Sequence, residues 1–185
     1  MKLRDIVDHN LTDKGTTHSY IPIYEELFPS KNRNDIKNVL EIGIAQGGSI
    51  KMWHDYFPNA TIYAIDNEEQ CKIPNWLGKY KRVKLFRGDG YSDEFIDKIK
   101  DIKFDIIIDD GPHGSYQKVF VEKYINLVPE NGTLVVEDVG RPEAAEMLGI
   151  FPQYNFITIE GTNSGADDRL LVYKKNKPQW WEKNE

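Results

Sequence analysis

Two acidic pairs follow apolar stretches of the sequence, and their types and spacing could do chemistry. Asp109 and Asp110 end the run FDIIIDD, and Glu137 and Asp138 end the run GTLVVED. If the two runs are neighbouring parallel strands, their carboxyl ends lie at the same edge of a sheet, which is where ligands bind in such sheets. Like charges gathered there repel one another, so the cluster needs a cation or bound protons to offset it.

The residue types favour a hard divalent cation over zinc. Asp110, Glu137 and Asp138 supply carboxylate oxygens, no cysteine is at hand, and His113 follows Asp110 by three positions. Oxygen ligands favour Mg²⁺, with Ca²⁺ or Mn²⁺ as alternatives. His113 is a candidate general base, because its ordinary pKa of about 6.5 lies near neutral pH. The plainer alternatives stay open: the acids can cap helices or pair with Lys and Arg, and His113 can bond the backbone.

A glycine-rich stretch, KNVLEIGIAQGGS, follows an earlier apolar run. Gly43, Gly47 and Gly48 allow the backbone to pass close to a ligand at a strand–helix turn, where the helix N-terminus offers free N–H groups. Gly43, Ala45 and Gly48 fit a loose dinucleotide fingerprint, and Asp66 lies 18 residues beyond Gly48. A carboxylate there can accept both hydroxyls of a ribose, in NAD or in S-adenosylmethionine. An ordinary tight turn, with Asp66 as a helix N-cap, is the alternative.

The elements that would position these residues alternate along the chain. Short apolar runs alternate with amphipathic stretches, of which SIKMWHDYF and YQKVFVEKYINLV have helical spacing. Strands that are apolar on both faces belong in a parallel sheet covered by helices on each side. The last two runs, NFITIE and RLLVYK, are separated by a polar loop and predict an antiparallel pair. The sequence predicts a doubly wound α/β domain, with strands in 38–42, 61–65, 83–86, 104–110 and 132–138 before that pair.

Length and composition indicate one soluble domain. The chain has 185 residues, of which 39% are hydrophobic, enough to build a core. We expect a helical segment in residues 1–30, a core in 36–175 and a polar tail in 176–185. The two tryptophans of the tail, Trp180 and Trp181, are expected to pack onto the body of the domain.

Charge and cysteine content exclude several classes of protein. The net charge of −6 gives no basis for a nucleic-acid binder that relies on bulk positive charge. The single cysteine, Cys71, rules out an intramolecular disulfide and fits a reducing compartment. The first residues hold no apolar run long enough for a signal peptide or a membrane span. We therefore expect a cytoplasmic protein with no nucleic-acid or membrane partner.

Glu41, a charged residue within an apolar run, helps to choose between the two cofactors. Glu41, Gly43, Gly47 and Ser49 resemble the first motif of the class I S-adenosylmethionine-dependent methyltransferases. The resemblance spans residues 36–175 and implies a Rossmann-like sheet of seven strands, the last antiparallel. Because S-adenosylmethionine carries a sulfonium and an ammonium, acidic groups near it favour its binding.

The acidic pairs narrow this resemblance to the metal-dependent sugar O-methyltransferases of macrolide tailoring and the cephalosporin-hydroxylase-like group. It implies that Asp110, Glu137 and Asp138 hold Mg²⁺ and that His113 is the base. The stretch TDKGTTHSYIPIYEELF is similar to the segment that closes over the cofactor in this group, although the chain is shorter than the macrolide enzymes. The implied cofactor-binding residues are Lys14, His18, Tyr24, Glu41, Gly43, Gly47, Ser49, Asp66 at the ribose, Asp89 near the adenine, Tyr91 and Asp109.

The sequence therefore predicts an enzyme that transfers a methyl group from S-adenosylmethionine to a hydroxyl of a sugar or glycoside, with a divalent metal. Enzymes of this group often assemble, so a homo-oligomer is consistent with the resemblance. One alternative is a methyltransferase of catechols or other phenols, which ionise more readily than sugars. Others are an NAD-dependent oxidoreductase, and a cofactor-binding module without activity that serves as an interaction domain.

Overall fold

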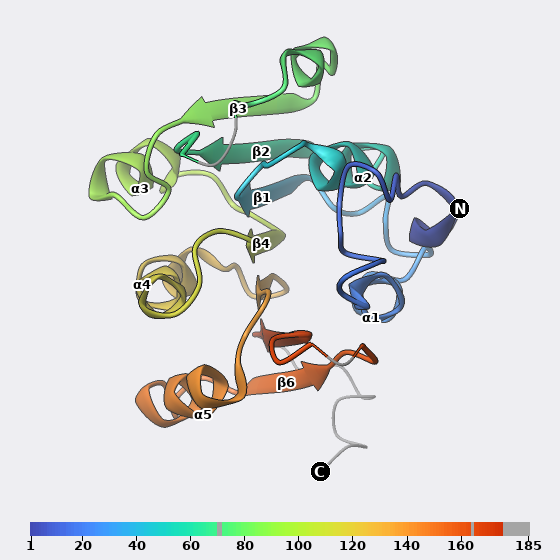
Figure 1. Ribbon diagram of the computed structural model, residues 1–185. Helices are drawn as coiled ribbons and strands as arrows, with labels where there is room; N and C mark the ends of the chain where they lie inside the picture. The colour runs from blue at the N-terminus through green and yellow to red at the C-terminus, as the bar shows by residue number, and fades with distance from the viewer. Residues whose placement is uncertain (70–71, 164, 176–185) are drawn as a thin grey trace.

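The computed structural model describes residues 1–69, 72–163 and 165–175, which form a layered α/β structure. Its centre is a seven-stranded sheet with the strand order β3-β2-β1-β4-β5-β7-β6 (Figure 1). The strands are β1 Asn38–Ile42, β2 Thr61–Asp66, β3 Val83–Arg87, β4 Ile106–Asp109, β5 Thr133–Val136, β6 Phe156–Glu160 and β7 Arg169–Lys174.

The direction of the strands confirms the predicted doubly wound sheet. Strands β1 to β5 are parallel to one another, and strand order reverses between β1 and β4. The predicted antiparallel pair is present, and β7 is the antiparallel strand. It lies between β5 and β6 and bonds to both, so β6 forms the edge of the sheet.

Helices cover both faces of the sheet, as expected for strands that are apolar on both sides. Helices α1 and α2 lie on one face, and α3, α4 and α5 on the other (Figure 1). Trp53 and Tyr24 belong to the core on the first face, and Phe95 and Phe120 to the core on the second. The helices are α1 Tyr20–Leu27, α2 Gly48–Tyr56, α3 Asp93–Ile99, α4 Ser115–Tyr124 and α5 Arg141–Ile150, with short 3₁₀ turns at Leu3–Asp5, Asn75–Lys79 and Ile125–Leu127.

Helix α5 was not predicted from the sequence. Its apolar stripe is narrow, since Ala144 and Met147 are its buried residues while Leu148 and Ile150 are exposed. The signal that could have found it is the proline near its first position, followed by the strong helix formers EAAEML.

Some expectations concern residues outside the described part of the chain. Trp180, Trp181 and Cys71 lie there, so the expected packing of the tail stays a prediction. Within the described residues, no helix is both long enough and apolar enough to cross a membrane.

Candidate functional site

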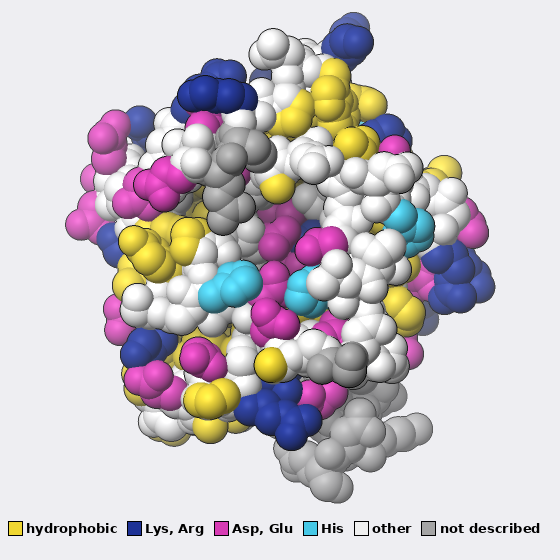
Figure 2. Space-filling view, in the orientation of Figure 1, with side chains coloured by type: hydrophobic (Ala, Val, Ile, Leu, Met, Phe, Trp, Pro, Cys, Tyr) yellow, Lys and Arg dark blue, Asp and Glu magenta, His cyan; other side chains and the backbone are white. Residues whose placement is uncertain are grey.

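A cavity of about 330 Å³ opens at the carboxyl ends of β1, β2 and β4, at the point where strand order reverses. Figure 2 shows acidic side chains gathered in the middle of this face, with histidines on both sides. The predicted site residues that line the cavity are Gly43, Asp66, Asp89, Tyr91, Asp110, His113 and Asp138. Asp13, from the segment before α1, also lines it and was not predicted.

The glycine-rich turn packs directly against the loop after β4. Gly43 has a φ of +93°, and a Cβ built on it would fall on the backbone carbonyl of Asp110. Gly47 has a φ of +82° and caps the N-terminus of α2, with the side chain of Leu77 against it. Glycine is therefore needed at position 43 both for its conformation and for the close approach of two cavity walls.

We expect Gly43→Ala to lower the free energy of unfolding by about 2 kcal/mol or more, because left-handed strain and a backbone collision add together. Urea denaturation of the two proteins measures it. Gly149→Ala is the matched control, since a Cβ there meets open space within α5 and alanine favours a helix. Equal losses for the two variants would contradict the requirement for glycine at position 43.

Two carboxylates stand at the β2 and β3 side of the cavity. Asp66 Oδ2 accepts the N–H groups of Ile44 at 2.8 Å and Ala45 at 3.3 Å, which fixes the carboxylate against the glycine-rich turn. Asp89 Oδ1 accepts the N–H of Tyr91 at 2.8 Å. A carboxylate oxygen can accept more than one hydrogen bond, so both groups keep acceptor capacity toward the cavity. They suit a ligand that presents hydroxyl groups, as a ribose does.

Several predicted cofactor-binding residues lie behind the cavity wall and not in it. Glu41 is fully buried, and the indole N–H of Trp53 donates to its Oε2. Burial raises the pKa of Glu41 to about 7, although the Lys14 ammonium opposes this. Glu41 was expected to contact the cofactor, but its buried side chain does not line the cavity. The other predicted residues absent from the wall are Lys14, His18, Tyr24, Gly47, Ser49 and Asp109.

Asp109 supports a wall residue instead of facing the cavity. The Tyr91 hydroxyl donates to Asp109 Oδ1 at 2.6 Å, and the carboxyl is 2% exposed. Burial raises the pKa of Asp109 to about 8, so the group is largely protonated at neutral pH. Two neighbouring acids on one strand end thus separate: Asp109 turns inward to hold Tyr91, and Asp110 turns toward the cavity.

Two of the three predicted metal ligands, Asp110 and Glu137, form ion pairs with the side chain of Lys14. Its Nζ lies 2.6 Å from Asp110 Oδ2 and 2.6 Å from Glu137 Oε2, and the residue is 1% exposed. Burial lowers the pKa of Lys14, but attraction to Asp110 and Glu137 outweighs this and holds it well above the ordinary value. Glu137 is itself buried, and the Tyr24 hydroxyl donates to its Oε1.

Asp138 lines the cavity from the loop that follows β5. Its φ is +55°, a left-handed conformation that turns the chain away immediately after β5. The Tyr20 hydroxyl donates to Asp138 Oδ1 at 2.7 Å, and His113 Nε2 lies 3.3 Å from Oδ2. Burial would raise the pKa of Asp138, but the bonds from His113 and Tyr20 hold it below its ordinary value.

The His113–Asp138 pair should be visible in the titration of the histidine. The hydrogen bond to Asp138 raises the pKa of His113 above 6.5, so in metal-free protein His113 holds its proton to higher pH than a free histidine does. NMR titration of its C2–H resonance measures this. We expect Asp138→Asn to move the midpoint to lower pH, because the anionic partner is gone. An unchanged midpoint would mean that the pair does not form.

The donor types fit a hard divalent ion, because three carboxylates follow two neighbouring strands. Asp110 and Asp138 line the cavity, whereas Glu137 is buried and does not line it. The counter-charge between Asp110 and Glu137 in this geometry is the Lys14 ammonium. Across the residues that the structure describes, no three His, Cys, Asp or Glu side chains surround a common point as metal ligands do. The predicted ligand set is therefore brought together but is not arranged around a metal position.

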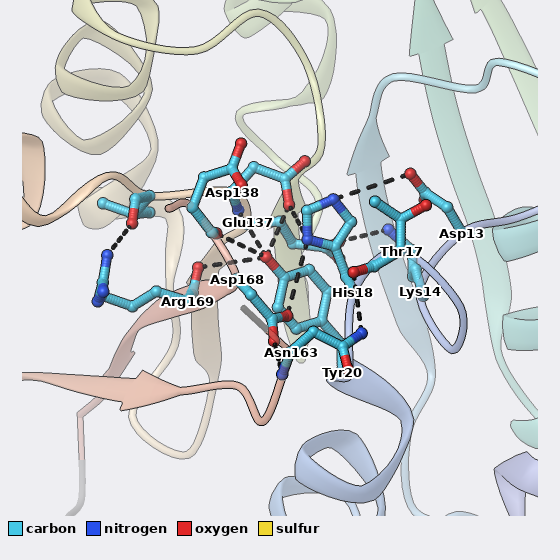
Figure 3. A network of polar contacts seen from close by, with 12 residues as sticks. Asp13, Lys14, Thr17, His18, Tyr20, Glu137, Asp138, Asn163, Asp168 and Arg169 are labelled. Atoms are coloured by element: carbon cyan, nitrogen blue, oxygen red, sulfur yellow. Dashed lines mark hydrogen bonds and ion pairs between the residues drawn. The ribbon is translucent and has the colours of Figure 1, made fainter. Parts of the chain in front are cut away.

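A polar network that the sequence did not predict joins the segment before α1 to the loop between β6 and β7 (Figure 3). Ser19 donates its backbone N–H and its hydroxyl to the Asp168 carboxylate at 2.9 and 2.8 Å. The Asn163 amide donates to the carbonyls of Thr16 and Thr17, each at 2.9 Å. These partners lie more than 140 positions apart in the sequence, so no local pattern could have indicated them.

His18 belongs to the same network. Its ring stacks on Tyr20 with 4.9 Å between ring centroids, and its Nδ1 lies 3.3 Å from Asp138 Oδ1. The side chain is 9% exposed and does not line the cavity. His18 and Tyr20 thus contact Asp138 from the N-terminal segment. Glu41, Asp110, Glu137 and Asp138 are called the acidic cluster below.

Known proteins with similar sequences are O-methyltransferases. The chain matches no established family profile. It is 31% identical over 135 residues to mycinamicin VI 2''-O-methyltransferase of Micromonospora griseorubida, covering 68% of this chain and 32% of that enzyme. It is 30% identical over 135 residues to 8-demethyl-8-(2-methoxy-alpha-L-rhamnosyl)-tetracenomycin-C 3'-O-methyltransferase of Streptomyces olivaceus, covering 68% of this chain and 33% of that enzyme. The chain thus spans about a third of the length of the curated relatives it matches.

A solved structure extends the likeness to the whole fold. The MycE methyltransferase from the mycinamycin biosynthetic pathway, in complex with Mg and SAH, matches with a TM-score of 0.62 and 25% identity, over 97% of this chain and 52% of that one. The sheet order and the glycine-rich turn thus define the fold of the class I S-adenosylmethionine-dependent methyltransferases. Within that class, the chain is a homologue of the macrolide sugar O-methyltransferases, which confirms the resemblance.

Proposed function

We propose that the protein is an S-adenosylmethionine-dependent O-methyltransferase that uses a divalent metal and acts on a hydroxyl of a sugar or glycoside. The observation that carries this is the composition of one cavity. Asp66 and Asp89 line its β2–β3 side, whereas His113, Asp138 and Asp110 line its β4–β5 side. A site for a hydroxyl-bearing cofactor therefore adjoins a base and an acidic cluster within about 330 Å³.

The cofactor would occupy the side of the cavity next to the glycine-rich turn. S-adenosylmethionine supplies an activated methyl group on a sulfonium. We assign Asp66 to the ribose hydroxyls, because the turn fixes its carboxylate. Asp89 and Tyr91 complete this wall, and Asp109 orients the Tyr91 hydroxyl.

We expect Asp66→Asn to weaken the binding of S-adenosylhomocysteine by about 10- to 100-fold, because hydrogen bonds to a charged acceptor contribute more than those to a neutral one. Isothermal titration calorimetry measures the change. Asp101→Asn removes an exposed acid that does not line the cavity and should leave the affinity unchanged. Equal affinities for the wild type and Asp66→Asn would remove Asp66 from the cofactor site.

The metal would be held by Asp110, Glu137 and Asp138, with Mg²⁺ preferred and Ca²⁺ or Mn²⁺ as alternatives. A divalent ion supplies Lewis-acid activation and a template for adjacent hydroxyls of the acceptor. The three carboxylates give this site its negative charge, and Asp110 and Asp138 place it at the wall of the cavity.

His113 is the proposed general base. A sugar hydroxyl is a poor nucleophile at neutral pH, so its proton must be removed as the methyl group is attacked. The His113 ring is 51% exposed, lines the cavity, and is held by Asp138 at 3.3 Å. Asp138 orients the ring and raises its pKa, which makes His113 a stronger base. The reacting hydroxyl would therefore lie between His113 and the cofactor.

We also propose an acceptor class, a cellular location and an oligomeric state for the protein. A sugar-bearing acceptor is supported by the relatives, which are named as O-methyltransferases of mycinamicin VI and of a rhamnosyl tetracenomycin. A cytoplasmic location rests on the single cysteine, and a homo-oligomer rests on the sequence resemblance. The division into a helical segment, a core and a tail rests on the sequence pattern together with that resemblance.

Thermal shift with S-adenosylhomocysteine and with NAD tests the cofactor class, because a ligand that binds the native state raises its melting temperature. We expect S-adenosylhomocysteine alone to stabilise the protein. Transfer of a labelled methyl group to glycosides and to catechol then tests the acceptor class. Stabilisation by NAD alone, or transfer to catechol but not to any glycoside, would contradict the proposal.

A further inference from the structure

The Lys14 ammonium occupies the centre of the acidic cluster. It lies 2.6 Å from oxygens of both Asp110 and Glu137, and 3.6 Å from Glu41 Oε1. Three carboxylates from three strand ends thus share one cation, and two of them are almost fully buried. Carboxylates surround a cation in this way in a metal-binding site, but here the cation is the Lys14 ammonium.

A second observation shows that one ammonium does not satisfy this cluster. Glu41 Oε1 is buried and has no hydrogen-bond partner among the described residues, although it faces the Lys14 ammonium. A buried carboxylate oxygen without a partner is costly, so the cluster has capacity for more positive charge than Lys14 provides. A divalent ion brings that charge.

Lys14 can leave the cluster without unfolding the sheet. It belongs to the segment before α1 and reaches the cluster through a flexible four-carbon side chain. Its backbone carbonyl is tied to the N–H groups of Tyr20 at 2.9 Å and Ile21 at 3.2 Å. The contacts of the segment with the β6–β7 loop are made by Ser19 and Asn163. Withdrawal of the ammonium therefore leaves the contacts of Ser19 and Asn163 in place. It removes the ion pairs that hold the chain around Lys14 against the cluster, so the backbone of that part of the segment should exchange faster.

We propose that Lys14 is the resident cation of the acidic cluster, and that a divalent metal ion which takes Asp110 and Glu137 as ligands displaces its ammonium. Lys14 therefore sets how tightly the protein holds the metal. This inference rests on the proposed function only in that the ion is the metal proposed there. It extends that proposal, because the sequence assigned Lys14 to the cofactor and not to the metal.

Titration with Mn²⁺, followed by the electron paramagnetic resonance signal of the free ion, tests this. We expect Lys14→Met to bind Mn²⁺ at least about tenfold more tightly than the wild type, because a competing positive charge has been removed. Lys51→Met is the matched control, since Lys51 pairs with Asp55 on α2 away from the cluster and should leave the affinity unchanged. Equal or weaker binding by Lys14→Met would overturn the inference.

Hydrogen exchange on the wild-type protein gives a readout that survives if Lys14→Met fails to fold. Saturating Mn²⁺ should raise exchange in peptides that cover residues 11–19 and leave α3, Asp93–Ile99, unchanged as an internal reference. Unchanged or slower exchange in 11–19 at saturation, or no Mn²⁺ binding at all, would overturn displacement.

The two proposals fail separately. If Lys14→Met binds Mn²⁺ more tightly but no methyl transfer is found, the resident cation stands and the proposed activity falls. If methyl transfer is found and Lys14→Met binds Mn²⁺ no better than the wild type, the activity stands and displacement falls.

Discussion

Replacing His113 with alanine will lower kcat for methyl transfer by about 10²- to 10⁴-fold, the usual contribution of a general base. The expectation rests on position: the ring lines the cavity, and Asp138 holds it at 3.3 Å. Because His113 is 51% exposed and belongs to no core cluster, its removal should not unfold the protein. Steady-state kinetics with a methylated acceptor as product measures the loss.

The matched control for His113 is His54→Ala. His54 lies on α2, bonds Asp55 through Nδ1 at 2.8 Å and packs against Tyr80, away from the cavity. We expect its kcat to stay near that of the wild type. The affinity for S-adenosylhomocysteine should be unchanged in both variants, since neither residue lies at the cofactor side. A His113→Ala enzyme with near-normal kcat would show that another group removes the proton.

Removing divalent metal will have the second large effect. Chelation with EDTA should lower the transfer rate by about 10³-fold, because Lewis-acid activation of a hydroxyl contributes several kcal/mol to lowering the barrier. Added Mg²⁺ should restore the rate to the wild-type protein but not to Asp110→Asn. Without metal the Lys14 ammonium pairs with Asp110 and Glu137, so the fold should persist after chelation and circular dichroism should be unchanged.

Binding of S-adenosylhomocysteine in EDTA provides the control for this experiment. The cofactor side of the cavity, at Asp66 and Asp89, is distinct from the acidic cluster, so the affinity should change little. Full activity after complete chelation would remove the metal from the reaction. A loss that Mg²⁺ restores in Asp110→Asn as well would mean that Asp110 is not a ligand.

The fold could be predicted from the sequence because its signals are local. Doubly apolar runs marked the parallel strands, and the helices SIKMWHDYF and YQKVFVEKYINLV showed clear spacing. The order of the last two strands was not predictable, since β7 inserts between β5 and β6 through contacts that only the folded sheet provides. Helix α5 was missed because it buries little apolar surface.

The site was predictable where strand ends determine position. Asp66 ends β2, and Asp110, His113 and Asp138 lie in the loops that follow β4 and β5. The structure brings all four to one cavity. The residues of the N-terminal segment were assigned by resemblance to the cofactor, yet Lys14 is committed to the acidic cluster. Burial explains the position of Lys14, because an ammonium that is 1% exposed must lie beside anions. The nearest anions follow strands about 100 residues away in the sequence.

Crystals grown with S-adenosylhomocysteine and Mn²⁺, and measured for anomalous scattering, test the central claim most directly. We expect an anomalous peak bound by Asp110, Glu137 and Asp138, the Lys14 side chain turned out of the cluster, and a ribose bonded to Asp66. An S-adenosylhomocysteine molecule bound elsewhere, with no peak at these carboxylates and Lys14 still between Asp110 and Glu137, would contradict the account.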